Sequence, residues 1–70
     1  GIEFEEATGL WDDMRGIERR APRAEEERFA RIASCRGKLW HAVFTVRGGS
    51  IRIISVRRAR KDEEDLYGQE

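Results

Sequence analysis

The apolar positions of the first fourteen residues repeat at helical spacing. Four of them are separated by steps of three or four residues, which places them on one face of a helix: Phe4, Ala7, Trp11 and Met14. The pattern therefore predicts a helix over residues 3–14. Gly9 inside it is unfavourable by roughly 1 kcal/mol relative to Ala, so we expect this helix to depend on packing against the rest of the chain.

Two runs in the second half of the chain are typical of β-strands. Residues 38–47 and 50–58 are rich in Val, Ile, Phe, Trp and Thr, and only Gly48 and Gly49 separate them. A Gly-Gly pair between two such runs favours a tight primed turn, in which both central residues need positive φ. The sequence thus predicts an antiparallel hairpin.

Counting outward from the two glycines gives the register of this hairpin. The predicted pairs are Val46–Ile51, Phe44–Ile53, Ala42–Ser55 and Trp40–Arg57 on one face, and Thr45–Arg52, Val43–Ile54, His41–Val56 and Leu39–Arg58 on the other. The first face is the more apolar, so we expect it to meet the core. A slip of one residue would exchange the two faces.

Weaker patterns predict the remaining elements. Residues 16–19 and 27–35 are candidate strands, residues 15–26 form a polar connection broken by Pro22, and Arg36-Gly37 makes a turn. Residues 59–70 are typical of a short helix anchored by Leu66 and Tyr67. The expected architecture is one α+β domain over residues 1–70, with an antiparallel sheet, an N-terminal helix and a short C-terminal helix.

The composition limits the chemistry that the chain can perform. It has 70 residues with a single cysteine, Cys35, and a single histidine, His41, so it offers no disulfide within the chain and no multi-Cys or multi-His zinc set. We expect neither a metal nor a cofactor. No stretch approaches the roughly 20 apolar residues of a membrane helix, and the acidic start is unlike a signal peptide. A cytoplasmic protein that does not enter a membrane is the expectation.

The charges are sorted along the chain although their sum is zero. The net charge is −5 over residues 1–14, +4 over 15–38, +6 over 39–61 and −5 over 62–70, and twelve of the fourteen bases are Arg. Arg binds phosphate and carboxylate oxygens with a planar fork. The basic middle therefore indicates a surface for an anionic polymer or an acidic partner. The alternative is that the acidic ends fold back over the basic strands.

The residues from Phe44 to Ala59, followed by Glu63 and Tyr67, resemble the BrnT family. The upstream segments that also resemble it are Gly1-Ile2, Phe4-Glu5-Glu6-Ala7, Trp11-Asp12-Asp13 and Glu27-Arg28-Phe29. The resemblance implies a toxin of a type II toxin–antitoxin module, with a fold related to RelE-type ribonucleases. It implies that the toxin cuts RNA and is neutralised by a BrnA-like ribbon-helix-helix antitoxin in a heterotetramer, with operator DNA bound only through that complex.

The chain departs from the family pattern at both ends. Family members usually begin with a further strand and helix, and this chain starts at what would be the Gly after that helix, so the resemblance predicts a domain without them. The family's last helix is commonly basic, whereas Asp62, Glu64 and Asp65 stand there in this chain.

A ribonuclease of this type needs no metal if the 2'-hydroxyl of RNA attacks the adjacent phosphate. Positioned arginines would stabilise the charge on that phosphate, and the hairpin offers Arg52, Arg57 and Arg58; the alternative for these is solvated arginines on an edge strand. For proton transfer the candidates are His41, the only side chain with an ordinary pKa near neutrality, and Glu63. The structural alternative for His41 is a packed histidine, and the alternative for Glu63 is a helix cap or the ion-pair partner of an arginine.

Four further residues are candidates for binding RNA. They are Arg47, Arg60, Lys61 and Tyr67. Tyr67 could stack on a base or close the core. The alternative function is a truncated or non-catalytic toxin-like protein that only binds an antitoxin or RNA.

Overall fold

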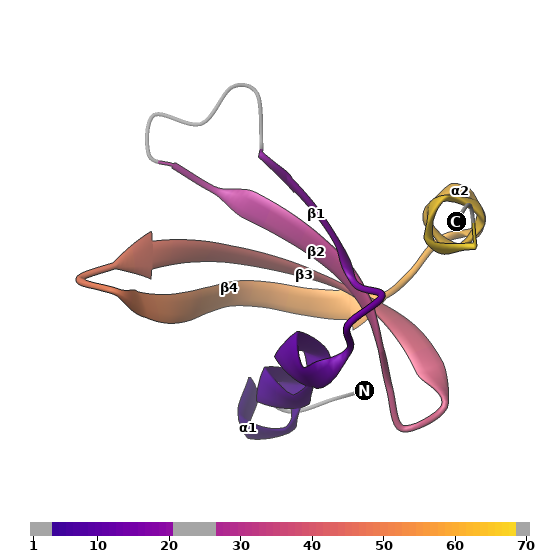
Figure 1. The fold of residues 1–70 in the computed structure, drawn as a ribbon, viewed down its shortest axis with the longest axis horizontal. Helices are drawn as coiled ribbons and strands as arrows, with labels where there is room; N and C mark the ends of the chain where they lie inside the picture. Colours follow the sequence, from indigo (N-terminus) through magenta and orange to yellow (C-terminus); the bar gives the residue numbers. More distant parts are fainter. Residues whose placement is uncertain (1–3, 21–26, 69–70) are drawn as a thin grey trace.

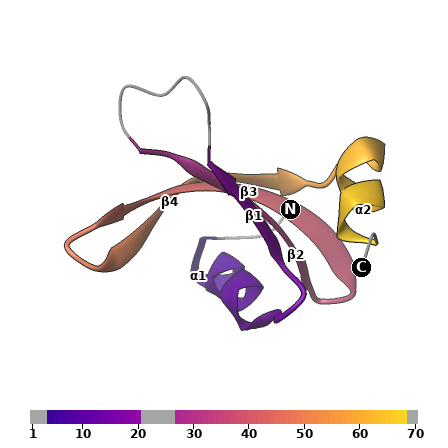
Figure 2. The same ribbon diagram turned by 45° about the horizontal axis from the view of Figure 1, so that its top comes forward.

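The computed structural model describes residues 4–20 and 27–68, and their centre is one antiparallel sheet with strand order β1-β2-β3-β4 (Figure 1). The strands are β1 (Ile17–Arg20), β2 (Phe29–Cys35), β3 (Lys38–Arg47) and β4 (Ser50–Arg58). Before them lie α1 (Phe4–Ala7) and the 3-10 helix η1 (Thr8–Asp12), and after them α2 (Lys61–Tyr67). Figure 2 shows α1 below the sheet and α2 at the end remote from the β3–β4 turn.

One face of the sheet carries the core. Its side chains Ala33, Trp40 and Ala42 are buried against Ala7 and Leu10 of the α1–η1 segment. Trp11, Cys35, Ile53 and Val56 pack around this cluster. We call this side of the sheet the core face, and the opposite side, which carries His41 and Val43, the His41 face. This cluster contains five of the seven hydrophobic residues that are buried in the described part of the chain. A core of this size is small, so polar contacts between the segments also matter for the fold.

The predicted N-terminal helix is present only in part. The chain makes a single α-helical turn over Phe4–Ala7 and then continues as a 3-10 helix that ends at Asp12. Met14, expected on the buried face, is 100% exposed. The α-helix ends early because Thr8 and Gly9 are both poor helix formers. The 3-10 helix that follows has a different number of residues per turn, so the side chains after Gly9 do not continue the face of the α-helix.

The turns of the sheet agree with the prediction. Gly48 and Gly49 have φ values of +57° and +81°, as a primed hairpin turn requires. Arg36 and Gly37 form the β2–β3 turn with φ values of +55° and +74°. Arg36 is a non-glycine residue in the left-handed region, a conformation that is unfavourable by roughly 1 kcal/mol.

The predicted register of the hairpin is right near the turn and wrong beyond it. Val46–Ile51, Thr45–Arg52 and Phe44–Ile53 pair as expected, but an irregularity follows and Val43 pairs with Ser55. One extra residue on β4, a β-bulge, moves all later pairs by one position. The observed pairs are Val43–Ser55, Ala42–Val56, His41–Arg57 and Trp40–Arg58. Arg57 and Arg58 therefore lie on the faces opposite to those predicted.

The other predicted elements are found with changed bounds. β1 and β2 confirm the two weaker strands, and α2 confirms the terminal helix, although Ala59 precedes it. Residues 21–26, which are half of the predicted connection and include Pro22, lie outside the described ranges, as do the first three and the last two residues. Among the helices that the structure describes, none has the length and apolar character needed to cross a bilayer.

Candidate active site

The β-bulge aligns His41 with Arg57 in a row across the sheet. Ile17 of β1 pairs with Ile32 of β2, Ile32 pairs with His41 of β3, and His41 pairs with Arg57 of β4. Paired residues of an antiparallel sheet point to the same face. The four side chains therefore share the His41 face, and two apolar residues flank the histidine on one side while a cation flanks it on the other.

Glu63 joins this row from the first turn of α2. Its two carboxylate oxygens accept hydrogen bonds from both Nη atoms of Arg57, each 2.8 Å long. Oε1 also accepts the backbone N–H of Arg60 at 2.8 Å, and Oε2 lies 3.3 Å from Nε2 of His41. Glu63 and His41 are 13% and 16% exposed, and Arg57 is 38% exposed. We call His41, Arg57 and Glu63 the His41 cluster.

The electrostatics of the His41 cluster separate the roles of its members. Hydrogen bonds from Arg57 lower the pKa of Glu63 to about 2 against the opposing effect of burial, and the same pair raises the pKa of Arg57. Burial lowers the pKa of His41 below its ordinary value; Arg57 and Arg60 act in the same direction and Glu63 opposes them. At neutral pH the cluster thus holds an ion pair beside a neutral imidazole, which can accept a proton.

A pocket of about 180 Å³ adjoins the His41 cluster. Its lining comes from β1, β2, β3 and α2, and comprises Ile17, Arg19, Ala30, Ile32, His41, Asp62, Glu63 and Leu66. Arg19 is exposed and was not among the candidate residues. The period-2 pattern of β1 could have identified it, because Arg19 lies two residues after Ile17 and so on the same face. Asp62 of α2 also lines this pocket.

Two of the predicted phosphate-binding arginines lie away from the His41 cluster. The bulge places Arg58 on the core face, where its guanidinium lies 5.4 Å from the ring centroid of Trp40. Arg52 shares the His41 face but stands five residues before Arg57, which is roughly 16 Å along an extended strand. The structure therefore does not bring the three arginines of β4 together.

Three of the four candidate RNA-binding residues lie at α2, and the fourth lies at the β3–β4 turn. Arg47 is exposed beside the β3–β4 turn, Arg60 precedes α2, and Lys61 Nζ lies 3.9 Å from Asp65 Oδ1. The hydroxyl of Tyr67 donates a 2.6 Å hydrogen bond to Oδ2 of Asp13. This contact joins Tyr67 to the N-terminal segment, as expected if Tyr67 closes the core and does not stack on a base.

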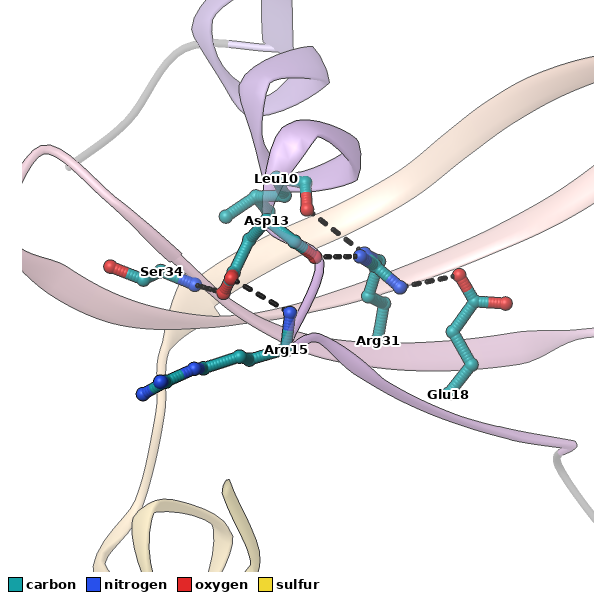
Figure 3. Close-up of polar contacts among 6 residues, drawn as sticks. All are labelled: Leu10, Asp13, Arg15, Glu18, Arg31 and Ser34. Carbon is teal, nitrogen blue, oxygen red and sulfur yellow. Dashed lines mark hydrogen bonds and ion pairs between the residues drawn. The ribbon is translucent and has the colours of Figure 1, made fainter. Parts of the chain in front are cut away.

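A network around Asp13 and Arg31 holds the N-terminal segment on the sheet (Figure 3). Arg31, 8% exposed, donates to the carbonyl oxygens of Leu10 and Asp13 at 2.9 and 2.7 Å and to Glu18 Oε2 at 2.7 Å. The carboxylate of Asp13 accepts the backbone N–H groups of Arg15 and Ser34. Since Asp13 also accepts the hydroxyl of Tyr67, the network extends to α2 and supports the position of Glu63.

The two interpretations of the sorted charges can now be weighed. One acidic residue near each end of the chain lies against a basic residue: Glu63 binds Arg57 of β4, and Glu6 Oε2 lies 2.8 Å from Nη1 of Arg36 in the β2–β3 turn. The fold-back alternative is thus realised at these positions. The described residues contain no group of three or more His, Cys, Asp and Glu side chains that could hold a metal ion.

Comparison with known proteins identifies the family. The model of a family described as "Ribonuclease toxin, BrnT, of type II toxin-antitoxin system" matches residues 1–63. The chain belongs to the BrnT family. No curated protein matches it significantly.

Membership in the BrnT family bears on the substrate that the His41 cluster could act on. The family is one of ribonuclease toxins, so an RNA substrate and an antitoxin partner are implied for its members. The matched range ends at Glu63 and contains His41 and Arg57 as well, so the whole cluster lies inside the part of the chain that resembles the family.

Proposed function

We propose that this BrnT family member is a metal-independent endoribonuclease in which His41 accepts the proton of the attacking 2'-hydroxyl. The observation that carries this proposal is the neutral, partly buried imidazole of His41 beside the ionised Arg57–Glu63 pair and the adjacent pocket. Burial lowers the pKa of His41 below its ordinary value, which favours the unprotonated imidazole that the first step of this reaction requires.

The reaction would be a transfer of the phosphoryl group within the RNA. The 2'-oxygen attacks the adjacent phosphorus while His41 takes its proton, the bond from phosphorus to the 5'-oxygen breaks, and that oxygen receives a proton from the imidazolium or from water. The products are a 2',3'-cyclic phosphate and a free 5'-hydroxyl. Neither redox chemistry nor an external nucleophile is needed.

The geometry supports distinct roles for the other residues. Glu63 is held by Arg57 in two hydrogen bonds and has a pKa of about 2, so it is a poor proton acceptor at neutral pH. We assign it a positioning role, in which its carboxylate orients His41 and stabilises the imidazolium as the aspartate of a catalytic triad does. Arg19, an exposed residue that also lines the pocket, is our candidate for binding the phosphate.

The partner of this toxin is proposed from the family resemblance. We propose a BrnA-like ribbon-helix-helix antitoxin that forms a heterotetramer with the toxin in the cytoplasm, and that brings the complex to operator DNA. A RelE-like fold is proposed on the same ground. An antiparallel sheet with helical segments against both faces is compatible with this proposal.

The proposal is tested with purified protein and a labelled RNA in the presence of EDTA. We expect cleavage that leaves cyclic phosphate and 5'-hydroxyl ends, a loss of about 100-fold or more for His41→Ala, and a smaller loss for Glu63→Gln together with a shifted pH profile. Lys38→Ala, an exposed change at the start of β3, is the matched control and should retain full activity. The loss of activity in His41→Ala, purified in the same way, excludes a contaminating nuclease.

Three results would contradict the proposal. They are no cleavage by the folded wild-type chain, cleavage that EDTA abolishes, and cleavage that His41→Ala leaves unchanged. The second candidate function, a non-catalytic protein that binds an antitoxin, is favoured by Asp62, whose carboxylate lines the pocket and opposes a phosphate there. Antitoxin binding without any RNA cleavage would establish that alternative.

A further inference from the structure

Apolar side chains from three elements line the pocket beside the His41 cluster. Ile17 of β1 and Ile32 of β2 lie in the same row as His41, and Leu66 belongs to α2. The pocket has a volume of about 180 Å³, so one part of a nucleotide, a base or a phosphate, can occupy it at a time. Apolar side chains stabilise the flat face of a base but do not stabilise a phosphate.

The part of the lining that α2 contributes is anionic. Asp62 and Glu63 bring two carboxylates to the pocket, whereas Arg19 of β1 brings one guanidinium. The cation nearest to Glu63, Arg57, is already bound by both oxygens of that carboxylate. Beside α2 the pocket therefore disfavours a phosphate and favours a neutral group that donates hydrogen bonds.

Asp62 is the carboxylate that can accept hydrogen bonds from such a group. Glu63 is occupied by Arg57 and by the backbone N–H of Arg60. In the described part of the chain, Asp62 forms no hydrogen bond or ion pair, and it is exposed. After the hydrogen bonds of Glu63, the charge of Asp62 also raises the pKa of Arg57. This effect places the free carboxylate of Asp62 close to the His41 cluster.

The four RNA bases differ in the donors that they offer to a carboxylate. Guanine carries two adjacent donors on its Watson–Crick edge, the ring N–H and the amino group. Adenine and cytosine place an acceptor nitrogen next to their amino group, and uracil places its N–H between two carbonyl oxygens. The two oxygens of a carboxylate accept hydrogen bonds only, so they form two good hydrogen bonds with guanine and meet a repelling acceptor in each of the other bases.

We propose that Asp62 binds the Watson–Crick edge of a guanine in this pocket, and that the chain cleaves RNA on the 3' side of guanosine. The cleavage position rests on the proposed function: His41 takes the proton of a 2'-hydroxyl, and His41 and Asp62 line one pocket, so the base at Asp62 belongs to the nucleotide that carries this hydroxyl. The ring of the guanine would lie against the apolar side chains of the pocket. Arg19 stays available for the phosphate.

The cleavage test compares RNA hexamers of uridine in which the third nucleotide is guanosine, adenosine, cytidine or uridine. We expect kcat/KM to be at least about tenfold higher for the guanosine hexamer, as one good bidentate contact provides, and the 5' fragment to end in guanosine 2',3'-cyclic phosphate. Asp62→Asn offers one acceptor and one donor, which suits adenine. This variant should therefore lower the ratio of guanosine to adenosine cleavage by about tenfold or more.

A matched variant on the same helix is the control. Asp65→Asn removes the same charge from α2, but Asp65 lies outside the pocket lining and the variant should keep the preference of the wild-type chain. Because Asp62 and Asp65 are both exposed, we expect both variants to fold, which their amide NMR spectra check.

Guanosine 3'-monophosphate tests the contact without catalysis. It should bind the wild-type chain at least about tenfold more tightly than adenosine 3'-monophosphate, shift the methyl NMR signals of Ile17 and Leu66, and lose its advantage in Asp62→Asn. Cleavage without a preference for guanosine, or a preference that Asp62→Asn leaves unchanged, would overturn the guanine site and leave the ribonuclease activity in place. Selective binding of guanosine 3'-monophosphate without cleavage would support the guanine site and contradict the proposed function. Absence of both would overturn both.

Discussion

Arg57 lies directly opposite His41 in the β3–β4 ladder, although the hairpin turn alone would place Val56 there. The bulge at Ile54 brings a guanidinium to the His41 face, where Glu63 of α2 binds it through both Nη atoms. The position of α2 on the sheet, the ionisation of Glu63 and the neutral state of His41 all depend on this register. A local irregularity of one strand therefore builds the candidate active site.

The first prediction compares the two adjacent arginines of β4. Arg57→Ala removes two charge-assisted hydrogen bonds and leaves the carboxylate of Glu63, 13% exposed, without this partner, so we expect a loss of about 2–3 kcal/mol in the free energy of unfolding. Arg58→Ala removes a cation–π contact at an exposed position and should lose about 0.5–1 kcal/mol. Urea unfolding at pH 7 measures both values.

The pKa of His41 provides an independent readout of the same pair. Arg57 helps to lower this pKa and Glu63 opposes it, so Arg57→Ala should raise the pKa in an NMR titration of the imidazole, whereas Glu63→Gln should lower it. Equal losses of stability in the two arginine variants, or an unchanged His41 pKa in both cluster variants, would contradict the register described here.

The second prediction concerns acid. The pKa of Glu63 is depressed from 4.5 to about 2, so the stability that this group provides is present above about pH 4.5 and is lost as the pH falls towards 2. We expect a loss of on the order of 2 kcal/mol from Glu63, less than the full shift implies because solvent reaches Arg57. Urea titrations between pH 6 and pH 2 should show this slope, and Glu63→Gln should reduce it. A pH slope that is unchanged in Glu63→Gln would show that another group causes the acid sensitivity.

The sequence was sufficient to predict the Gly48-Gly49 turn and the two strands that flank it. Gly48 and Gly49 have the positive φ values of a primed turn, and the first three pairs of the hairpin follow from them. The bulge was missed because Ile53 and Ile54 are both apolar, and a period-2 pattern cannot show which of two adjacent isoleucines leaves the ladder. The predicted faces of Arg57 and Arg58 are therefore wrong, and so is the expected cluster of arginines on β4.

The N-terminal segment illustrates a second limit of the pattern. The spacing of Ala7 and Trp11 predicted one α-helix, and the chain changes to a 3-10 helix after one turn. Tertiary hydrogen bonds stabilise this form, since the carbonyl of Leu10 accepts Nε of Arg31. A contact between residues 21 positions apart has no local signal. The roles of Arg31 and Asp13 could not be predicted for the same reason.

The third prediction concerns the contact between α2 and the turn after η1. Tyr67→Phe removes the hydroxyl that donates to Asp13 and should lower the free energy of unfolding by about 1–2 kcal/mol. Because Glu63 lies on the same helix, the amides of α2 should exchange faster and the distance from Glu63 to His41 should become less well defined, which broadens the NMR signals of the imidazole. Asp65→Asn on the exposed side of α2 is the control. If α2 exchanges no faster in Tyr67→Phe than in Asp65→Asn, the tether does not hold the helix.

The fourth prediction tests the close approach of Gly16 to Arg31. A Cβ at position 16 would lie well inside van der Waals contact with the guanidinium of Arg31, which the carbonyls of Leu10 and Asp13 and the carboxylate of Glu18 hold in place. Gly16→Ala should therefore destabilise the wild-type chain by about 2–3 kcal/mol through overpacking. In an Arg31→Ala background, which is itself expected to lose about 3 kcal/mol because the buried carbonyl of Leu10 loses this donor and Glu18 loses its ion-pair partner, the same substitution should lose less than about 1 kcal/mol. A double-mutant cycle on urea unfolding measures this coupling; additive losses would mean that Gly16 is required for a reason other than the guanidinium beside it.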